Sequence, residues 1–468
     1  MLQASTRAQG GRVGRSSPPR PFSELPGLST PAPVQALEWM LRPAELLDRC
    51  QQRFGATFRL RVPPGEFIVV SGRADLKRIF AATADAMTAG DVNRSIAGVL
   101  VGSQSTIVLD GDPHLGRRRL LLPAFHGERM RFYGETMADI TRDALARFRP
   151  GRRFALHPPM QDITLEIIVR TVFGADAGIE AQTLVDELRT FLKLGELPLS
   201  LLPILYLSAN PRVEDDRVWK FLLSRRNRAR GIVRRQIERR RAARREGRQD
   251  VLSMLLDSRD AQGAPMTDAE LLDELMTTLA AGHESTATTL AWCFERILSH
   301  PQVLAQLRAE LCAAGGPDAP PETLSSLPYL DATIKEVLRQ RPVLPFVVRR
   351  LQQPTELGGY LLPEHTLVAP CIHLAQRDPA VFAEPQLFRP ERFLGTAPDP
   401  LSFLPFGGGV RRCVGVHFAL YEMKIVLAHV LGRCDLELVD PPPLKALRRS
   451  ITFWPSGGTR VRLRSFLH

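Results

Sequence analysis

Hydrophobic and polar positions follow two different periods along this chain. Near the start, residues 57–62 and 66–71 are apolar-rich stretches on either side of Pro63, Pro64 and Gly65, which predicts two short strands joined by a tight turn. Beyond them apolar residues recur mostly at spacings of three and four, which predicts helices. The chain ends in short strand-like segments at 451–454 and 460–463. The pattern as a whole predicts a mainly α fold with small β sheets.

The longest helix is predicted over residues 267–300. Thr267 and Glu270 form a capping box, Pro301 supplies a stop, and no proline lies between. At 1.5 Å per residue this helix is about 50 Å long, enough to cross a domain. Small residues in its middle, around residues 279–282, fit either a flat or large ligand or close packing against another helix, and the sequence does not decide between them.

Length and composition favour one large domain. The 468 residues are 44% hydrophobic, enough for a large core, and no Gly/Ser or charged linker separates periodic segments after residue 34. We therefore predict a single domain over residues 34–468 and a disordered basic tail over residues 1–33. The acid-free, Arg-containing residues 1–23 also fit an organelle transit peptide.

The net charge of +12 is concentrated in an Arg-rich segment at residues 225–248. Ile232, Val233 and Ile237 are interleaved with the arginines, and no aromatic residue is available to stack on bases. This pattern favours the solvated face of a surface helix over a nucleic-acid site.

Neither a membrane span nor a disulfide framework is predicted. The most apolar stretch, residues 197–207, is short and contains Pro198 and Pro203, so it fits either an apolar lip at a pocket entrance or a plain core helix. The six cysteines lie far apart in sequence, which argues against structural zinc and favours a reducing compartment such as the cytoplasm.

One cysteine, Cys413, lies between a Gly-rich loop and a helix predicted over residues 414–431. Free amides at the helix start, together with Arg411 and Arg412, favour the thiolate and predict a lowered pKa. The segment resembles the heme-binding signature of cytochromes P450. Its fixed positions in this chain are Phe406, Gly409, Arg411, Cys413 and Gly415. The resemblance implies the P450 fold, with heme b as the cofactor and Cys413 as the axial iron ligand.

Further segments resemble the family in the same chain order. Glu336 and Arg339 are similar to its Glu-x-x-Arg pair, with Arg392 as the third member. A buried carboxylate between two guanidiniums is costly unless it is fully hydrogen-bonded, so this triad should lock the cysteine loop in place rather than do chemistry.

The long helix contains a sequence similar to the family's oxygen-activation segment, Ala-Gly-His-Glu-Ser-Thr at residues 281–286. The resemblance implies catalytic roles for Glu284, Ser285 and Thr286, with Ala281 against the heme. Glu284 would bring protons in from solvent, and the Ser285 hydroxyl would bond a carbonyl one turn earlier and open the helix locally. Serine stands where the family commonly has threonine.

Four basic residues are similar to the family's contacts with the heme propionates, because guanidinium offers two parallel donors to a carboxylate. They are His114, Arg118, Arg349 and Arg411. The positions that match the family's substrate pocket carry no charge, which implies an apolar substrate such as a fatty acid, terpene, steroid or polyketide. They are Ala280, Gly282, Val343, Leu344, Phe346, Val347 and Ile451.

The chain looks closest to soluble bacterial members, and the resemblance implies a monomeric monooxygenase that inserts one oxygen atom of O2 into its substrate. No flavin, nicotinamide or iron–sulfur fingerprint is present, so electrons should come from a ferredoxin or flavodoxin with its reductase, docking where Arg412, Lys424 and Arg433 supply positive charge. Two alternatives remain open: a reductase-independent heme-thiolate isomerase or peroxygenase, and a non-catalytic heme ligand sensor.

Overall fold

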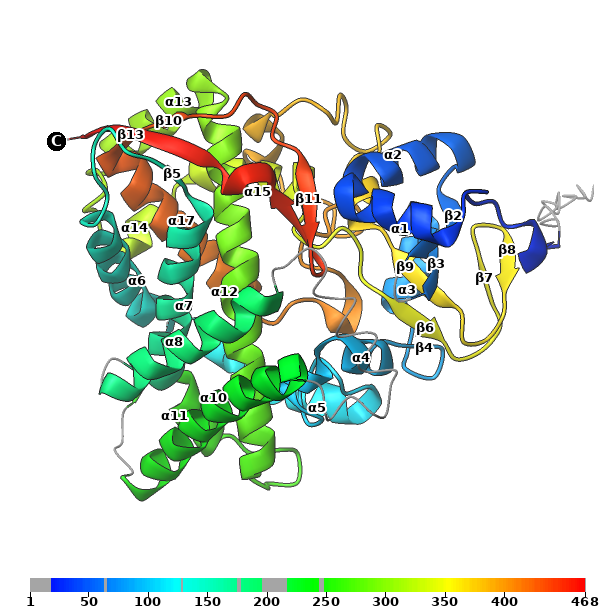
Figure 1. The fold of residues 1–468 in the computed structure, drawn as a ribbon, viewed down its shortest axis with the longest axis horizontal. Helices are drawn as coiled ribbons and strands as arrows, with labels where there is room; N and C mark the ends of the chain where they lie inside the picture. Colours follow the sequence, from blue (N-terminus) through cyan, green and yellow to red (C-terminus); the bar gives the residue numbers. More distant parts are fainter. Residues whose placement is uncertain are drawn as a thin grey trace, which may run out of the picture.

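A computed structural model describes residues 18–62, 65–127, 129–174, 178–195, 217–243 and 248–467. Most of the helices pack around one long central helix, and the sheets lie mainly on one side of it (Figure 1). The larger helices are α1 (Ala32–Leu41), α2 (Pro43–Phe54), α3 (Arg73–Ala81), α4 (Gly90–Val101), α5 (Gly111–Leu121), α6 (Arg129–Leu145), α7 (His157–Phe173), α8 (Gly178–Gly195), α10 (Arg217–Ala242), α12 (Asp268–Leu298), α13 (Pro301–Ala313), α15 (Pro328–Gln340) and α17 (Val416–Arg433). Shorter ones are α11 (Val251–Asp257), α14 (Pro321–Ser325) and α16 (Ile372–Ala375).

The strands form four small sheets, as the sequence predicted for a mainly α fold. The largest has the order β2-β3-β9-β6-β4, and the others are β1-β8-β7, β10-β13-β5 and β11-β12. The bounds are β1 (Arg20–Pro21), β2 (Thr57–Val62), β3 (Gly65–Val70), β4 (Met87–Thr88), β5 (Arg153–Ala155), β6 (Arg349–Leu351), β7 (Thr355–Leu357), β8 (Tyr360–Leu362), β9 (Leu367–Pro370), β10 (Cys434–Leu438), β11 (Ala446–Arg449), β12 (Thr452–Pro455) and β13 (Arg460–Phe466). The predicted hairpin is confirmed, since β2 pairs with β3 in antiparallel register from Thr57 opposite Val70 to Val62 opposite Gly65.

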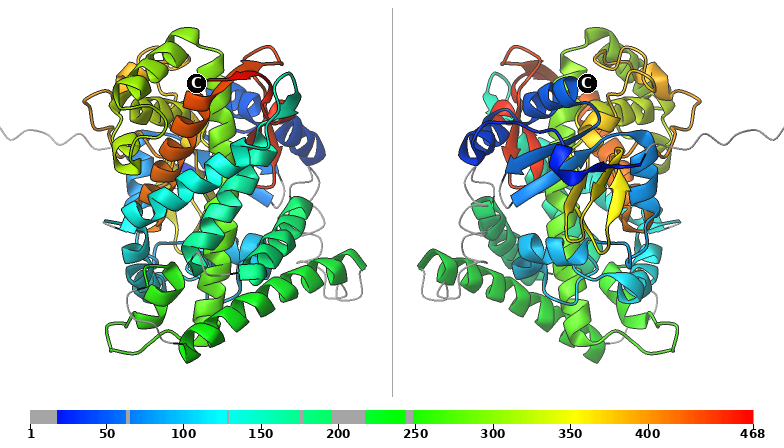
Figure 2. Two further views of the ribbon diagram at one scale, coloured as in Figure 1. Left: turned by 90° about the vertical axis from the view of Figure 1, so that its left-hand side faces the viewer. Right: turned by 90° about the vertical axis from the view of Figure 1, so that its right-hand side faces the viewer.

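Helix α12 runs through the middle of the molecule (Figure 2). It has the predicted capping box, with the Thr267 hydroxyl accepting from the Glu270 amide and the Glu270 carboxylate accepting from the Thr267 amide. Helices α7, α10, α15 and α17 all pack against it. A Cβ on Gly282 would lie 2.8 Å from Cγ1 of Ile168 in α7, so the small residue here permits close helix packing. Gly282 therefore faces α7, which is wrong for the pocket position predicted from the sequence.

The disordered tail is shorter than predicted. Arg20 and Pro21 pair in parallel with Tyr360 and Leu361, and Arg20 also lies over the Tyr360 ring at 4.0 Å. Leu25 is buried in the small core beneath that sheet. Disorder was the wrong prediction for residues 20–33, because strand pairing and a buried leucine outweigh their Pro-rich composition. The earlier residues 1–17 lie outside the described chain.

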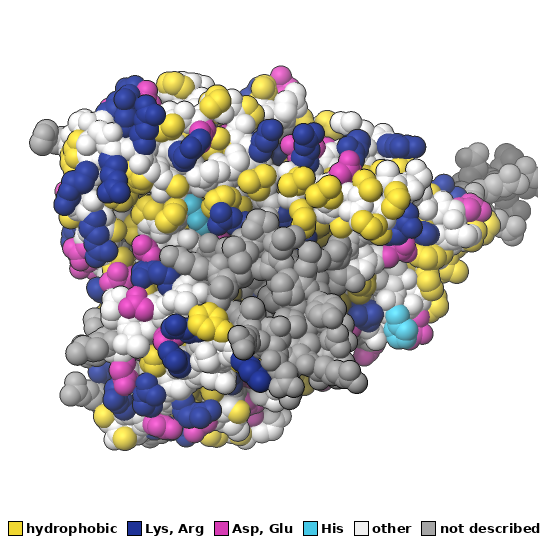
Figure 3. Space-filling model, in the orientation of Figure 1, with side chains coloured by type: hydrophobic (Ala, Val, Ile, Leu, Met, Phe, Trp, Pro, Cys, Tyr) yellow, Lys and Arg dark blue, Asp and Glu magenta, His cyan; other side chains and the backbone are white. Residues whose placement is uncertain are grey.

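The Arg-rich helix α10 is held by acidic partners on its neighbours. Arg225 and Arg228 pair with Glu187, and Arg235 and Arg239 pair with Glu180. The remaining pairs are Arg230 with Asp273, Arg240 with Asp250 and Arg241 with Asp268. On the lower part of the face in Figure 3, basic and acidic side chains are accordingly interspersed. The paired arginines support a surface helix rather than a nucleic-acid site.

All six cysteines are free, as the sequence predicted. Among the described residues, no helix has both the length and the apolar character needed to cross a membrane. The apolar stretch at residues 197–207 lies outside the described part of the chain.

Candidate functional site

The loop that carries Cys413 is a compact turn placed directly before α17. The Cys413 amide donates to the Phe406 carbonyl at 2.9 Å, and a 3-10 turn, η6 (Gly409–Arg411), lies between them. Gly415 caps the start of α17. Gly409 has φ +63°, a conformation that only glycine adopts without strain. The signature residues therefore bend the chain back on itself so that Cys413 precedes the helix.

Part of the Cys413 side chain is accessible to solvent, although protein atoms surround most of it. Burial is the largest influence on the thiol and raises its pKa, outweighing the Gly415 amide, Arg118 and Arg412, which lower it. The thiol is therefore accessible and at the same time desolvated by the protein around it. The sequence-based prediction of a lowered pKa is wrong for the polypeptide itself, because the burial it could not show dominates.

The predicted structural triad is assembled between α15 and the 3-10 turn η5 (Pro390–Phe393). Arg339 donates to both carboxylate oxygens of Glu336, at 2.7 and 2.8 Å, and Arg392 lies 3.4 Å from the same carboxylate. Glu336 and Arg339 are fully buried. The Arg339 guanidinium also donates to the carbonyls of Gln376 and Pro385. The charges are thus hydrogen-bonded on both sides, as a buried ion pair requires.

Gln376 connects this triad to the cysteine loop, and the sequence analysis missed it. Its side-chain amide donates to the carbonyls of Leu338 and Arg339 at 3.0 Å each, and its oxygen accepts from the Leu404 amide at 2.8 Å. Leu404 lies just before Phe406, so a buried glutamine holds the start of the loop against the end of α15. A lone glutamine after a short helix gives no sequence signal of this role.

The four basic residues expected at the propionates form one cluster. Burial, with the charges of Arg411 and Arg118, lowers the pKa of His114 to about 4. Burial and Arg411 likewise lower the pKa of Arg349 to about 10. Arg118 donates to the backbone carbonyl of Arg412, next to Cys413.

Among the described residues, Asp110 is the carboxylate that acts on His114, Arg349 and Arg411. It pairs with Arg411 and also accepts from the amides of Ala89 and Gly90 at 3.0 and 2.8 Å. Two guanidiniums and an imidazole thus share one acid, and Arg118 adds a further positive charge close to His114. Such an excess of positive charge is electrostatically unfavourable in a buried setting unless further anions bind. The cluster fits a ligand that carries carboxylates.

The middle of α12 has one open face. Between residues 271 and 297 the exposed positions are Ala281 and Ser285, one helical turn apart. All the other residues in that stretch are buried or half-buried. Both residues therefore share one open face of an otherwise buried helix, and their assignment to the heme side stays a prediction.

The Ser285 hydroxyl donates to the Ala281 carbonyl at 3.1 Å, which is the predicted contact with the previous turn. The helix nevertheless continues unbroken from Asp268 to Leu298, so the predicted local opening is not present. One hydroxyl bond to a carbonyl that keeps its place in the helix is too weak to separate the turns.

Glu284 points from α12 toward α7. Its carboxylate accepts from Gln161 at 2.6 Å and from Thr288 at 3.2 Å, and the His157 ring lies 3.4 Å away. Burial acts to raise the pKa of Glu284, but the hydrogen bond and charge of His157, with the Gln161 amide, lower it overall. The acid is thus held charged between the two helices.

Thr286 does not share the open face with Ser285. It is buried and lies beside Glu422 of α17, a fully buried carboxyl whose pKa burial raises well above its ordinary value. The structure does not support grouping Thr286 with Glu284 and Ser285. Glu422 itself was not singled out from the sequence, where a glutamate in a helix indicates an exposed position.

The residues predicted to line a substrate pocket differ in their surroundings. Ala280, Leu344, Phe346 and Val347 are half-buried, Val343 is buried and Ile451 is exposed. Phe346 stacks on Trp39 with ring centroids 5.3 Å apart, and the Val343 carbonyl accepts from the Phe453 amide.

Comparisons with known proteins agree with this geometry. Residues 28–459 match the family model described as "Cytochrome P450". A Mycobacterium tuberculosis protein described as "Putative cytochrome P450 135B1" is 36% identical over 444 residues, which cover 94% of this chain and 91% of the relative. Another from the same organism, "Putative cytochrome P450 137", is 35% identical and covers 97% and 94%.

Two solved structures share the fold. The structure titled "Retinoic acid bound cyanobacterial CYP120A1" superposes with a TM-score of 0.80 at 26% identity, covering 96% of this chain and all of that one. The cytochrome P450DA heme domain superposes with a TM-score of 0.83 at 22% identity, covering 96% and 98%.

Proposed function

Because this chain belongs to the cytochrome P450 family, whose members are heme-thiolate monooxygenases, we propose that Cys413 binds the heme iron of this enzyme. The protein is an oxidoreductase that carries heme b with a cysteine thiolate as axial ligand. The observation that carries the assignment of the ligand is the placement of Cys413. It is the accessible cysteine of the signature loop, and it lies close to Arg118 of the basic cluster.

The heme, when bound, supplies an iron centre that activates O2 with two electrons and two protons so that one oxygen atom enters the substrate. Coordination to a metal deprotonates a thiol outright, which overcomes the raised pKa of Cys413. Arg118, Arg349 and Arg411 would bind the propionates by charge-assisted hydrogen bonds. Neutral His114 would donate one more.

We propose that Ser285 and Glu284 handle the protons. The Ser285 hydroxyl lies on the open face of α12, where it could release its bond to the Ala281 carbonyl and donate its proton toward the site. Glu284 is next to it in sequence and half-buried, and it is connected to His157 and Gln161 of α7. This arrangement supports a proton route that enters between α7 and α12 rather than directly from solvent.

The substrate is proposed to be an apolar small molecule in the class of fatty acids, terpenes, steroids or polyketides. The half-buried Ala280, Leu344, Phe346 and Val347 carry no charge, which supports this choice. The related structure CYP120A1 is titled as binding retinoic acid, an elongated apolar acid. That title supports a ligand of similar character here.

Electrons are proposed to come from a ferredoxin or flavodoxin that docks on the surface behind Cys413. Of the three cations expected there, Arg412 is exposed, whereas Lys424 pairs with Asp331 and Arg433 with Asp318. Arg412 is therefore the residue through which we expect salt to weaken docking. The six free cysteines support a reducing cytoplasmic location, and we propose that the enzyme acts there as a monomer.

Carbon-monoxide difference spectroscopy of the reduced protein tests the ligand assignment. The wild type should show the strongly red-shifted band of a thiolate-bound heme, and Cys413→Ser should lose it. Cys312→Ser is the matched control, because Cys312 is also free and exposed but lies in α13. A band that survives in Cys413→Ser contradicts the proposal.

The class of reaction is tested by comparing product formation with peroxide alone and with ferredoxin, reductase and nicotinamide. A monooxygenase needs the full electron supply. Product from peroxide alone would indicate a peroxygenase, and spectral changes on ligand binding without any product would indicate a sensor.

A further inference from the structure

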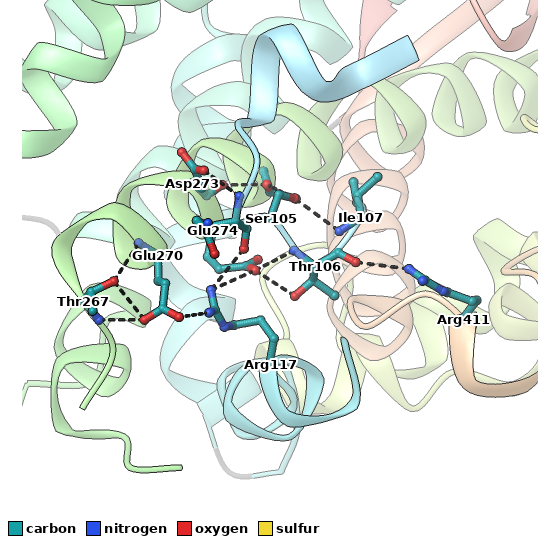
Figure 4. A network of polar contacts seen from close by, with 11 residues as sticks. Ser105, Thr106, Ile107, Arg117, Thr267, Glu270, Asp273, Glu274 and Arg411 are labelled. Atoms are coloured by element: carbon teal, nitrogen blue, oxygen red, sulfur yellow. Dashed lines mark hydrogen bonds and ion pairs between the residues drawn. The ribbon is translucent and has the colours of Figure 1, made fainter. Parts of the chain in front are cut away.

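The segment at residues 102–109 connects α12 to the basic cluster. At one end, the amides of Gln104 and Thr106 donate to Asp273 and Glu274 of α12, at 2.9 and 2.6 Å. At the other end, the Thr106 carbonyl accepts from Nη1 of Arg411 at 3.2 Å. Figure 4 shows Thr106 between Glu274 and Arg411, so one residue touches both. Whatever fixes Thr106 therefore also acts on Arg411.

Glu274 is the group that fixes Thr106. One carboxylate oxygen, Oε1, accepts both the Thr106 amide and the Thr106 hydroxyl, at 2.6 and 2.8 Å. The side chain is 1% exposed, and its other oxygen, Oε2, has no hydrogen-bond partner. A buried carboxylate with one oxygen unsatisfied is unusual for a purely structural contact, because the charge costs free energy that an amide of the same shape would avoid.

Glu274 lies among charged groups of both signs. Nη1 of Arg117 in α5 lies 3.5 Å away, and that arginine also pairs with Glu270 one turn earlier on α12. Asp273 is adjacent and pairs with Arg230 of α10, which lies near Arg226. Burial is the largest influence and raises the pKa of Glu274 to about 7, with Asp273 adding to the rise, while Thr106 and Arg117 lower it.

We propose that Glu274 is a positioning residue that, in its charged form, holds segment 102–109 and through Thr106 orients Arg411 toward the heme. A proton on Glu274 weakens the two bonds to Thr106 and the pairing with Arg117 at the same time. The segment then loosens at slightly acidic pH, and access to the heme pocket increases. The proposal rests on the proposed function, since Arg411 matters here as a propionate contact.

Hydrogen exchange of heme-loaded protein tests the contact directly, with single amides resolved by fragmentation and rates corrected for intrinsic chemistry. The Thr106 amide should exchange about tenfold faster at pH 6 than at pH 8, which is the ratio of the neutral fractions around a pKa of about 7. The Leu404 amide, which lies outside this segment and donates to the neutral side chain of Gln376, serves as the internal reference.

Three variants separate Glu274 from other titrating groups. In Glu274→Gln, the Thr106 amide should exchange at the fast rate at every pH. Thr106→Val removes only the hydroxyl bond, which raises the pKa of Glu274 and moves the transition to higher pH. Glu270→Gln is the matched control: it takes away the other partner of Arg117 but does not touch Thr106, so the transition near neutral pH should remain.

The rate of carbon-monoxide association with reduced heme gives a second readout, because carbon monoxide does not titrate. This rate should rise in wild type from pH 8 to pH 6 and be independent of pH in Glu274→Gln. Persistence of the wild-type pH dependence in Glu274→Gln, or an unshifted transition in Thr106→Val, would overturn the proposal. Failure of the thiolate assignment would appear separately as a missing red-shifted band, with the exchange of Thr106 unaffected.

Discussion

Gly408 packs against the ring of Phe80: a Cβ built on Gly408 would lie 2.8 Å from Cγ of that ring. Phe80 belongs to α3 and is buried together with Leu404 of the cysteine loop. Gly409 is closer still to Phe80, but its neighbour is the Phe80 backbone carbonyl. The glycines before Cys413 therefore set the loop against α3.

This contact predicts a rescue that depends on which glycine is changed. Gly408→Ala should push the loop away and cost about 1–3 kcal/mol of stability, with a smaller red-shifted carbon-monoxide band. Phe80→Leu in the same protein should restore much of that band, because the obstacle is a side chain. Gly409→Ala should not be rescued by Phe80→Leu, since its obstacle is backbone. Equal rescue of both would show that Phe80 is not the constraint.

Arg349 is predicted to retain the cofactor. Its guanidinium is buried in the basic cluster, so Arg349→Gln should remove one charge-assisted bond to a propionate, at a cost of about 1.5–3 kcal/mol. Heme transfer to apomyoglobin should then be roughly 10- to 100-fold faster. Arg350→Gln is the control, because the adjacent Arg350 pairs with Asp91 instead. Similar transfer rates for both variants would place the propionates elsewhere.

Ser285 is predicted to govern coupling rather than heme binding. Ser285→Ala should leave the carbon-monoxide spectrum intact while product formed per nicotinamide oxidised falls, because an alanine cannot donate a proton. Thr289→Ala provides a comparison on the same helix, since the Thr289 hydroxyl donates to the Ser285 carbonyl and is buried. If coupling is unchanged in Ser285→Ala, protons do not pass through this hydroxyl.

His429 is predicted to make the fold sensitive to acid. Burial, with Arg433 and Arg142, lowers the pKa of His429 from 6.5 to about 4. Between those values the unfolded chain binds a proton that the folded chain does not, so the free energy of unfolding falls as pH drops from 6.5 to 4. The slope for one proton is about 1.4 kcal/mol per pH unit.

Urea unfolding of His429→Gln across that range measures this contribution. The variant should show a shallower fall by roughly one proton, because its amide does not titrate. His365→Gln is the control, since His365 is 68% exposed at its side chain. Parallel pH profiles for wild type and His429→Gln would show that His429 does not contribute to the acid sensitivity.

Motifs with several fixed positions were predictable from the sequence. The capping box at Thr267 and Glu270 involves neighbours in the chain, so local rules suffice. The triad of Glu336, Arg339 and Arg392 was found because its members belong to a known pattern, and the structure brings them together.

Contacts between distant segments were not predictable. The bonds of Gln376 to Leu404 and of Glu274 to Thr106 join residues far apart in the chain, and each partner is unremarkable in its own segment. The raised pKa of Cys413 was missed for the same reason, because desolvation depends on atoms that the local sequence does not show. Gly282 was misplaced because a small residue suits a ligand and a neighbouring helix equally well.

The burial of α12 limits how relatives of this enzyme can diverge. Nearly every turn of that helix is buried in the core, so most substitutions in it lower stability before they can alter selectivity. Between residues 271 and 297 the exposed positions are Ala281 and Ser285, and the proposed role of Ser285 in proton transfer restricts its replacement as well. New substrate preferences should therefore arise by mutation in the segments that surround α12, while the helix itself changes slowly.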